Sequence, residues 1–337
     1  MIILAVESSC DETAVALVRD GRTVLADCIA SSVEMHRIYG GVVPEIASRK
    51  HIEVIAQLAD QALEQAGLSR GDIDAVAVTY APGLIGAVLV GVSFAKSVAY
   101  ALGVPLIPVH HVRGHIAANY LAHPDLEPPF VCLCVSGGTS LLVDVKGYTE
   151  MEILGATRDD AAGECFDKIA RVMGLGYPGG PVVSKFAAEG DPDAIPFPRA
   201  MLHSGDLRFS LSGLKTAVVT YINNERAAGR ELNVPDICAS FTAAVVDVQV
   251  AKARAALRET GAPTFCLGGG VAANPTLRAA YEQMCAEEGV RLVMPPLASC
   301  GDNAGMIAEV ALDRYRAGAF SPLSTDALAH GDLEVPY

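Results

Sequence analysis

Two histidines four residues apart have the most direct chemical interpretation of any spacing in this sequence. They lie in the segment HHVRGH (110–115), where a helix would place the imidazoles of His111 and His115 on one face, able to chelate a metal ion. Surface histidines that bind no ion are the plainer interpretation of such a pair. The segment lacks the glutamate of the HExxH pattern, which is the general base of zinc proteases, so proteolysis is not supported.

A metal site needs a third ligand, and we assign this role to Asp302 in the segment SCGDN (299–303). The residue stands at an expected boundary between a loop and a helix, where an aspartate that only caps the helix is the alternative. Two histidines and one carboxylate with open coordination positions suit iron, zinc or another divalent ion. Such an ion acts as a Lewis acid on a carbonyl or a phosphate.

Three short segments have the composition of ligand-binding turns. ESSCDET (7–13) offers hydroxyls, carboxylates and backbone N–H groups in one bend, and SGGTS (136–140) offers N–H groups that glycine leaves accessible. Ordinary hairpin turns are the alternative for each of these two. GGGVAAN (268–274) follows an expected strand and opens an expected helix, which favours a nucleotide's phosphate or sugar. It is not GxGxxG, so a dinucleotide-binding fold is disfavoured.

An acidic segment, DDAAGECFDK (159–168), precedes the glycine pair of YPGGP (177–181). Its charged side chains would share one side of a helix, which by itself is typical of a solvated face. A carboxylate such as Asp167 could accept hydrogen bonds from ribose hydroxyls. Gly179 and Gly180 could let the backbone approach a base or a sugar.

Alternating strands and helices are expected to position these segments. Strands separated by helices require crossover connections and a largely parallel or mixed sheet covered on both faces. The expected strands are 2–7, 13–18, 22–28, 74–80, 105–109, two within 129–145, 264–269 and 291–296. The expected helices are 44–66, 84–101, 111–122, about 236–259, one from 275 and one from about 302.

The chain also repeats a pattern. IILAVESSCDETAVALV (2–18) and PFVCLCVSGGTSLLVDV (129–145) both consist of an apolar strand, a small-polar turn and a second apolar strand. The repeat predicts two related lobes, each opening with a hairpin whose turn points into a cleft between them. We expect lobe I to comprise 1–109 joined by a C-terminal helix (303–337), and lobe II to comprise 110–302. The segment 174–235, richer in Gly, Pro and charge, is expected to be a flexible insertion in lobe II.

Composition excludes several classes. The chain has 337 residues, of which half are hydrophobic and 19% charged, which excludes a disordered or coiled-coil protein. The formal charge of −14 argues against a nucleic-acid binder that needs no partner. Nine scattered cysteines without a CxxC pair predict reduced thiols in the cytoplasm. The apolar stretch 81–109 is broken by prolines and glycines and predicts a buried helix and a strand, so we expect a soluble protein without membrane association.

Ten segments together resemble one family, the TsaD subunits of bacterial tRNA N6-adenosine threonylcarbamoyltransferase, formerly called O-sialoglycoprotein endopeptidases or Gcp. One departure is Thr139-Ser140, where the family has His or Asn followed by Thr; a cradle of backbone N–H groups would be insensitive to it. The matching segments are ESSCDETA (7–14), GGVVPEIASRKH (40–51), PGLIGAVLVG (82–91), HHVRGH (110–115), VSGG (135–138), RDDAAGECFDKIAR (158–171), GYPGGP (176–181), FSLSGLKT (209–216), GGGVAAN (268–274) and SCGDNAGMIA (299–308).

The resemblance implies a fold and a set of site residues. The fold is the actin/sugar-kinase/Hsp70-like (ASKHA) α/β fold, with two lobes of duplicated RNase H-like units and a ligand cleft between them. One divalent metal ion per subunit, iron(II) with zinc as the alternative, would be held by His111, His115 and Asp302. Asp11 and Glu12 match the acidic, catalytic pair near the reacting group. The residues implied to bind the substrate are Cys134, Val135, Ser136, Gly137, Gly138, Asp167, Gly180 and Asn274.

The implied reaction moves a threonylcarbamoyl group from threonylcarbamoyl-AMP to N6 of the adenine beside the anticodon, in tRNAs that read codons beginning with A. This amine is a poor nucleophile, so the site must polarise the carbonyl, align both partners and stabilise the departing phosphate. We hypothesise that Asp11 or Glu12 removes the amine proton. An ATP-dependent phosphotransferase or ATPase of the same fold is the alternative, although it has no use for the His-x-x-x-His set.

The resemblance also implies partners: tRNA, a TsaB-like paralogue and a TsaE-like P-loop ATPase, all cytoplasmic, with the adenylate supplied by a separate synthase. Because the chain is strongly acidic, we expect the isolated subunit to bind tRNA weakly. Local basic residues and the partner chains would then supply the attraction. The basic residues considered are Arg37, Arg49, Lys50, Arg113 and Lys215.

Overall fold

A computed structural model describes residues 1–335 and divides them into two compact units. Unit 1 contains Met1–Glu127, Tyr148–Glu150 and the chain from Pro295 onward, and unit 2 contains Pro128–Gly147 and Met151–Met294. Each unit consists of one five-stranded sheet with helices packed against it.

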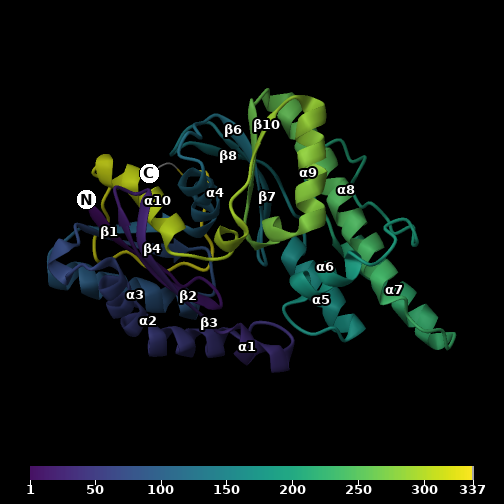
Figure 1. Cartoon of the computed structure of the whole chain (residues 1–337), viewed down its shortest axis with the longest axis horizontal. Coiled ribbons are helices and arrows are strands. Elements are labelled where there is room, and N and C mark those ends of the chain that lie inside the picture. Colours follow the sequence, from purple (N-terminus) through teal and green to yellow (C-terminus); the bar gives the residue numbers. More distant parts are fainter. Residues whose placement is uncertain (336–337) are drawn as a thin grey trace. The chain divides into compact units, whose positions relative to one another are not determined.

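The sheet of unit 1 has the order β3-β2-β1-β4-β5. β1 pairs antiparallel with β2 and parallel with β4, so the sheet is mixed. Nearly every residue of β1 and β2 is buried, because helices cover both faces (Figure 1). The strands are β1 (Ile2–Glu7), β2 (Glu12–Arg19), β3 (Thr23–Ser31), β4 (Ala75–Ala81) and β5 (Leu106–His110).

Two groups of helices cover this sheet. α2 and α3 pack on the face that bears Leu4 and Val6, and α10, against which α4 packs, contacts the same strands from the other face. α2 begins at Pro44, which suits the first helical turn, and is capped after Ala66 by Gly67 in the left-handed conformation. The helices are α1 (Val33–His36), α2 (Pro44–Ala66), α3 (Ile85–Leu102), α4 (His111–Ala122) and α10 (Gly305–Arg316).

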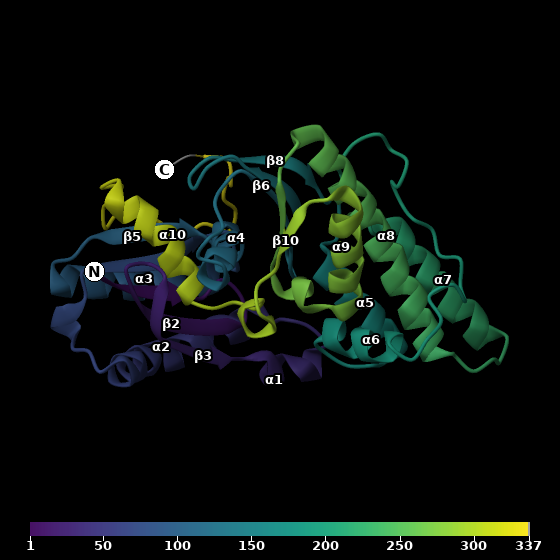
Figure 2. The same cartoon turned by 45° about the horizontal axis from the view of Figure 1, so that its top comes forward.

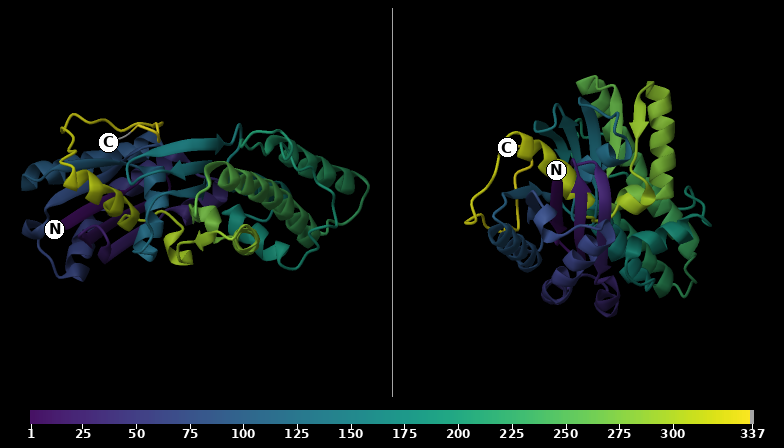
Figure 3. Two further views of the ribbon diagram at one scale, coloured as in Figure 1. Left: turned by 90° about the horizontal axis from the view of Figure 1, so that it is seen from above. Right: turned by 60° about the vertical axis from the view of Figure 1, so that its left-hand side comes forward.

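Unit 2 repeats the same strand order, β8-β7-β6-β9-β10, with β6 antiparallel to β7 and parallel to β9. Its helices flank its own sheet and each other (Figures 2 and 3). The strands are β6 (Phe130–Val135), β7 (Ser140–Val145), β8 (Met151–Ala156), β9 (Thr264–Gly268) and β10 (Arg291–Val293). The helices are α5 (Ala162–Met173), α6 (Gly179–Ala187), α7 (Ser212–Ala227), α8 (Val234–Thr260) and α9 (Pro275–Glu288).

The predicted repeat is confirmed, because each unit opens with an antiparallel hairpin, β1–β2 or β6–β7, and places it identically in its sheet. The pattern did not predict β8, an edge strand in which only Met151 and Gly155 are buried. The last helix begins at Gly305, three residues after the expected start.

The expected lobe boundary at residue 109/110 differs from the boundary between the two units. The segments 110–127 and 295–302 belong to unit 1, because α4 packs closely on α10. A Cβ on Gly114 would lie 2.8 Å from Cδ1 of Ile307, so glycine allows this approach. The segment 174–235 forms α6, α7 and connecting loops, and it contributes Val183, Phe197 and Val218 to the core around α5 and α8.

Two helices, α3 and α8, are long and apolar enough to span a membrane by length and composition. α3 places Val88, Val92 and Ala95 in the core of unit 1, and α8 is mostly buried among the helices of unit 2. As expected for 81–109, the apolar stretch is divided into a helix and the strand β5. α8 therefore has the burial of a core helix, whereas α3 packs one face on the core of unit 1 and leaves the other exposed.

Candidate metal centre

The structure brings His111, His115 and Asp302 together. β5 ends at His110 and α4 begins at His111, so His115 follows one turn later on the same helix face. Asp302 lies three residues before α10, the helix against which α4 packs. One ligand atom from each of the three side chains lies within 4.8 Å of the other two, which is compatible with a single ion between them.

The carboxylate of Asp302 is not used to cap α10. Asn303 Oδ1 accepts the Met306 N–H at 2.9 Å, and Asp27 of β3 accepts the N–H groups of Ala304 and Gly305 at 3.4 and 3.1 Å. These two side chains satisfy the first N–H groups of the helix, so the capping alternative for Asp302 is excluded. Asp302 is therefore directed to the histidines.

His111 has one ring nitrogen engaged and the other facing Asp302. Its Nδ1 lies 2.9 Å from Oε2 of Glu7 and 3.2 Å from Oγ of Ser9, whereas its Nε2 lies 3.6 Å from Oδ1 of Asp302. A carboxylate only accepts, so Nδ1 carries the proton that it donates to Glu7. Glu7 is fully buried and also accepts the Thr79 hydroxyl at 2.5 Å. This is the outer carboxylate that commonly orients a metal-binding histidine.

His115 supports a cation at this position independently. It is 1% exposed, and neither ring nitrogen has a hydrogen-bond partner within residues 1–335. Its Nε2 lies 3.2 Å from Oδ1 of Asp302 without the alignment of a hydrogen bond. A buried imidazole without a partner is costly, and an ion held by the three side chains would remove that cost. The donor set thus fits a divalent transition metal.

The charges of the site are strongly coupled. Burial would raise the pKa of Asp302, but the facing imidazoles of His111 and His115 outweigh it and bring that pKa to about 2. Burial would lower the pKa of His111, but the carboxylates of Glu7 and Asp302 raise it to about 9. A proton and a metal ion therefore compete for Nε2 of His111.

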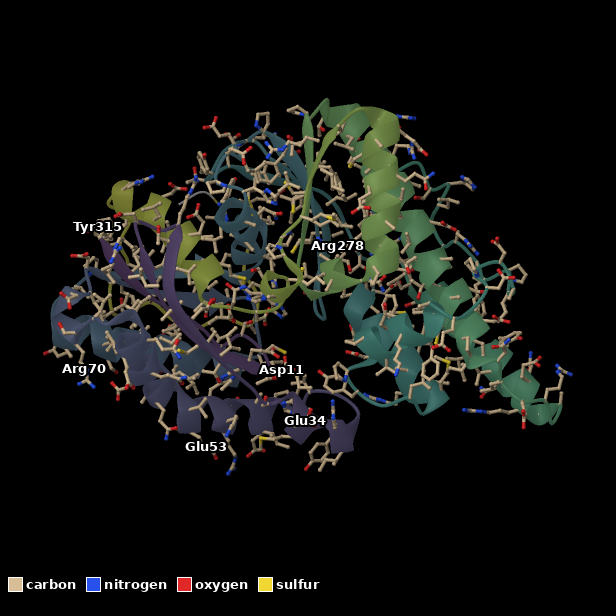
Figure 4. All side chains as sticks on the ribbon, in the orientation of Figure 1. Asp11, Glu34, Glu53, Arg70, Arg278 and Tyr315 are labelled. Carbon is tan, nitrogen blue, oxygen red and sulfur yellow. The ribbon has the colours of Figure 1, made fainter. Side chains whose placement is uncertain are left out.

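Asp11, labelled in Figure 4, is the last residue of the turn between β1 and β2, and Glu12 is the first residue of β2. Three consecutive backbone carbonyls of this turn accept hydrogen bonds from three different elements of unit 1. The carbonyl of Ser9 accepts from the N–H of Leu84 (2.8 Å), that of Cys10 from Nε2 of His51 (3.0 Å), and that of Asp11 from N and Oγ of Ser32 (2.9 and 2.8 Å). These hydrogen bonds therefore fix the backbone conformation of the turn.

The surroundings of Glu12 bear on the hypothesis that Asp11 or Glu12 acts as the base. Burial raises its pKa, and the neighbouring carboxylates of Asp11 and Asp302 raise it further, to about 9. Its Oε1 accepts the Ser31 hydroxyl at 3.0 Å. A carboxyl group with this pKa is protonated at neutral pH and donates rather than accepts a proton. Of the two residues, Asp11 is consequently the candidate base.

The residues expected to bind substrate all lie in unit 2. Cys134 and Val135 end β6, and the turn from Ser136 to Thr139 is closed by a 2.8 Å bond from Ser136 N–H to the Thr139 carbonyl. A Cβ on Gly137 or Gly138 would meet no atom within 4 Å, so their backbones are open to a ligand. The first N–H groups of α5 are already bound to this hairpin, which leaves the turn itself as the accessible surface.

Asp167, Gly180 and Asn274 have different surroundings. Oδ1 of Asp167 accepts the Gly179 N–H at 2.6 Å, and Oδ1 of Asn274 caps α9 by accepting the N–H of Leu277 at 3.1 Å. Gly180 has open space where a Cβ would lie. The short 3-10 helix η3 (Gly270–Ala273), which precedes Asn274, packs against β6 and α5, and α6 packs against α5.

Other expectations need correction. The acidic segment 159–168 is not simply a solvated face, because Asp160 forms ion pairs with Lys168 and Lys215. Arg113 cannot contact tRNA, because it is 1% exposed and its guanidinium donates to the backbone carbonyls of Leu333, Thr149 and Val335. Sequence reasoning also missed Glu7 and His51 as partners of the site; both lie in matching segments, but nothing in their spacing indicates the contacts that they make.

Comparison with known proteins shows the family to which the chain is related. The model of the family described as TsaD, tRNA N6-adenosine threonylcarbamoyltransferase, matches residues 23–309. A protein named tRNA N6-adenosine threonylcarbamoyltransferase from Moorella thermoacetica is 54% identical over 326 residues, covering 97% of this chain and 95% of its own. One of the same name from Clostridium botulinum (strain Kyoto / Type A2) is 50% identical over 326 residues, covering 97% and 96%.

Solved structures show the fold. Full-length HypF in its phosphate- and nucleotide-bound form has a TM-score of 0.63 at 15% identity, over 95% of this chain and 47% of that one. Component A of (R)-2-hydroxyglutaryl-CoA dehydratase from Acidaminococcus fermentans has a TM-score of 0.56 at 13% identity, over 95% and 99%. These likenesses, together with the two sheets of equal strand order, establish the two-lobed ASKHA-like α/β fold.

Proposed function

Because the chain belongs to the TsaD family, the tRNA N6-adenosine threonylcarbamoyltransferases, and so is a tRNA-modifying transferase, we propose how its residues divide the reaction. The metal centre and the acidic turn of unit 1 would serve the reacting group. The hairpin turn of unit 2 would hold the adenylate. The observation that carries the proposal is the convergence of His111, His115 and Asp302 beside a carboxylate, Glu7, that directs Nε2 of His111 toward them.

The metal would be held by His111 Nε2, His115 and Asp302, one ion per subunit, as iron(II) with zinc as the alternative. When bound, it supplies Lewis-acid polarisation of the carbonyl or the phosphate of the donor. Glu7 keeps the Nδ1–H of His111 engaged and thereby leaves Nε2 available. A phosphotransferase or ATPase of the same fold is not favoured, since it would leave this buried set of ligands without a role.

Threonylcarbamoyl-AMP would lie along Cys134–Gly138, with its phosphate near the open backbone of Gly137 and Gly138. Asp167 would accept from the ribose hydroxyls, because each oxygen of a carboxylate can accept more than one hydrogen bond. Gly180 and Asn274 would complete the contact with the ribose and base.

In the transfer, N6 of the adenine attacks the carbamoyl carbon, a C–N bond forms, and the C–O bond to the phosphate of AMP breaks. The amine proton goes to Asp11, the candidate base. Glu12, protonated at neutral pH, donates a hydrogen bond toward the developing negative charge. Both residues stand on a turn whose carbonyls are bound on three sides, so their positions are set before substrate arrives.

The partners and the location are part of the proposal. Family members act on tRNA, and we infer a cytoplasmic complex with a TsaB-like paralogue and a TsaE-like P-loop ATPase. Of the basic residues considered for tRNA, Arg37 and Arg49 are exposed although each forms an ion pair with a glutamate. Because the chain has a formal charge of −14 and these side chains are paired with carboxylates, the isolated chain would bind tRNA weakly and depend on its partners.

The test is to combine the protein and these partners with synthetic threonylcarbamoyl-AMP and tRNA, and to measure the modified nucleoside by mass spectrometry. We expect product with the wild-type chain and none with Asp302→Asn. The Glu53→Gln variant, which alters an exposed carboxylate on α2, should form product like wild type. No product from a metal-loaded wild-type chain would contradict the proposal.

A further inference from the structure

Two buried histidines outside the metal site are hydrogen-bonded, directly or through Ser32, to the turn that contains Asp11. His36, the last residue of α1, is 0% exposed, and His51, in the second turn of α2, is 1% exposed. Neither is a candidate ligand, and the proposed reaction assigns neither a role. Their hydrogen bonds nevertheless lead to consecutive backbone carbonyls, those of Cys10 and Asp11.

His51 is held in one tautomer. Its Nε2 lies 3.0 Å from the carbonyl oxygen of Cys10, and its Nδ1 lies 2.7 Å from Oγ1 of Thr13. A carbonyl oxygen only accepts, so Nε2 carries the hydrogen, and in the neutral ring Nδ1 accepts the hydroxyl hydrogen of Thr13. His51 therefore ties the residue before Asp11 to the residue after Glu12.

His36 reaches the same turn through Ser32. The backbone N–H of Val43 donates to Nδ1 of His36 at 3.2 Å, so the hydrogen of the neutral ring is on Nε2, which lies 3.0 Å from Oγ of Ser32. The Ser32 hydroxyl accepts from His36 and donates its own hydrogen to the carbonyl of Asp11 at 2.8 Å. Donor and acceptor are thus assigned for each hydrogen bond from Val43 through His36 and Ser32 to Asp11.

The two carbonyls belong to the peptide planes on either side of the Asp11 Cα. A peptide unit is planar, so fixing both planes fixes φ and ψ of Asp11 and the direction of its Cβ. We propose that His51 and His36 are positioning residues that set the direction in which Asp11 presents its carboxylate. This inference rests on the proposed role of Asp11.

The hydrogen bonds of His51 and His36 require neutral imidazole rings. The surroundings of His51 favour this neutral form. Burial lowers its pKa, and this outweighs the raising effect of the Cys10 carbonyl and of the carboxylates of Glu7 and Asp11. Thr13 is also buried, so the loss of either bond would leave an unsatisfied polar group next to the turn.

The test uses two amide substitutions that separate the two ring nitrogens. His51→Gln places an amide nitrogen near the position of Nε2 and keeps the donor to Cys10, whereas His51→Asn places its amide near Nδ1 and loses that donor. We expect the Asn variant to lose between about 10- and 100-fold in the single-turnover rate, the scale of a reacting group displaced by about 1 Å. Its KM for threonylcarbamoyl-AMP and its bound metal should not change, and the Gln variant should recover most of the rate.

Two corresponding variants at position 36 test the hydrogen bonds that lead from His36 through Ser32 to Asp11. His36→Asn keeps an acceptor for Val43 but loses the donor to Ser32, and His36→Gln keeps that donor. The melting temperature of every variant is measured, and rates are compared only where the protein is fully folded. Equal rates in the Gln and Asn variants at position 51, whether both are normal or both are reduced, would overturn the role of the Cys10 contact.

Failure of the proposed function is distinguishable. Transfer activity that is absent in wild type, or unchanged in Asp11→Asn, counts against the proposed function. The imidazole ¹⁵N shifts of the wild-type chain require no activity and report the tautomers. Hydrogen on Nε2 of both histidines supports the positioning of Asp11, and hydrogen on Nδ1 of His51 overturns it.

Discussion

Oε2 of Glu7 lies 2.9 Å from Nδ1 of His111, although the two residues are 104 positions apart in the chain. Glu7 ends the central strand of the unit 1 sheet, and His111 begins the helix that follows the edge strand β5, so the contact joins the middle of the sheet to the helix after its edge. The carboxylate determines which nitrogen of His111 carries hydrogen. It thereby leaves Nε2 of His111 facing Asp302, the orientation that a metal-binding histidine needs.

Glu7→Gln should weaken metal binding without removing a ligand. The amide is a poorer acceptor for the Nδ1–H of His111, and we expect the metal dissociation constant to rise between about 10- and 100-fold. Competition with a chromophoric chelator measures it, with Glu53→Gln as the control because that side chain is exposed and far from the site in sequence. Unchanged affinity in Glu7→Gln would contradict the orienting role.

Asp11→Asn and Glu12→Gln should differ in their effects on single-turnover transfer at saturating threonylcarbamoyl-AMP. Loss of the candidate base should cost about 10²-fold or more. A glutamine at position 12 donates a hydrogen bond as the protonated Glu12 does, so the Glu12→Gln variant should lose clearly less of the transfer rate. Near wild-type rates in both variants would remove both residues from the mechanism, and a larger loss in Glu12→Gln would reverse the assignment.

Gly138→Ala should separate binding from folding. The added Cβ meets no atom within 4 Å, so the free energy of unfolding should change by less than about 0.5 kcal/mol. A ligand on the turn would be held away from the backbone, so calorimetry should show weaker binding of threonylcarbamoyl-AMP. Gly213→Ala, which also finds space in unit 2, is the matched control and should bind normally. Equal affinities in the two variants would place the adenylate elsewhere.

Protonation of Glu309 should make the free energy of unfolding depend on pH. Oε1 of this buried residue accepts from Arg22 at 3.0 Å, Oε2 has no partner among the residues that the structure describes, and burial raises its pKa from 4.5 to about 7 despite Arg22. The folded state then binds the proton more tightly than the unfolded state. Stability contributed by the protonated form is therefore present below pH 4.5 and lost as the pH rises to about 7, by up to about 3 kcal/mol.

Urea unfolding of the metal-free protein between pH 4.5 and 8 measures this slope. Glu309→Gln does not titrate, so its free energy of unfolding should fall less over that range than that of wild type. Glu53→Gln, at an exposed position (Figure 4), should keep the wild-type slope. Parallel curves for Glu309→Gln and wild type would contradict the raised pKa.

Much of the fold is predictable because it depends on local patterns. The two strand–turn–strand segments predict two related sheets, since apolar runs around a small-polar turn form the same hairpin wherever they occur. The helical spacing of His111 and His115 likewise predicts that they share a face. Asp302 could be joined to them because carboxylate and imidazole are complementary ligands, although its position depends on the packing of α10 against α4.

The remaining features depend on contacts between distant segments, which no local pattern carries. The bond of Glu7 to His111, the burial of Arg113 beneath the C-terminal segment, and the bond of His51 to the Cys10 carbonyl all arise only when the sheet of unit 1 is assembled. The raised pKa of Glu12 has the same origin, because it requires burial and Asp302 as well as its neighbour Asp11.

Transfer measured against added metal tests the central claim most directly. Metal-free protein, combined with its partners, threonylcarbamoyl-AMP and tRNA, is titrated with iron(II) under anaerobic conditions, and with zinc in parallel. We predict that the single-turnover yield of modified nucleoside rises to saturation at one equivalent per chain, and that Asp302→Asn neither binds the ion nor reaches this yield. Full transfer by metal-free protein in the presence of a chelator, or unchanged binding by Asp302→Asn, would contradict the account.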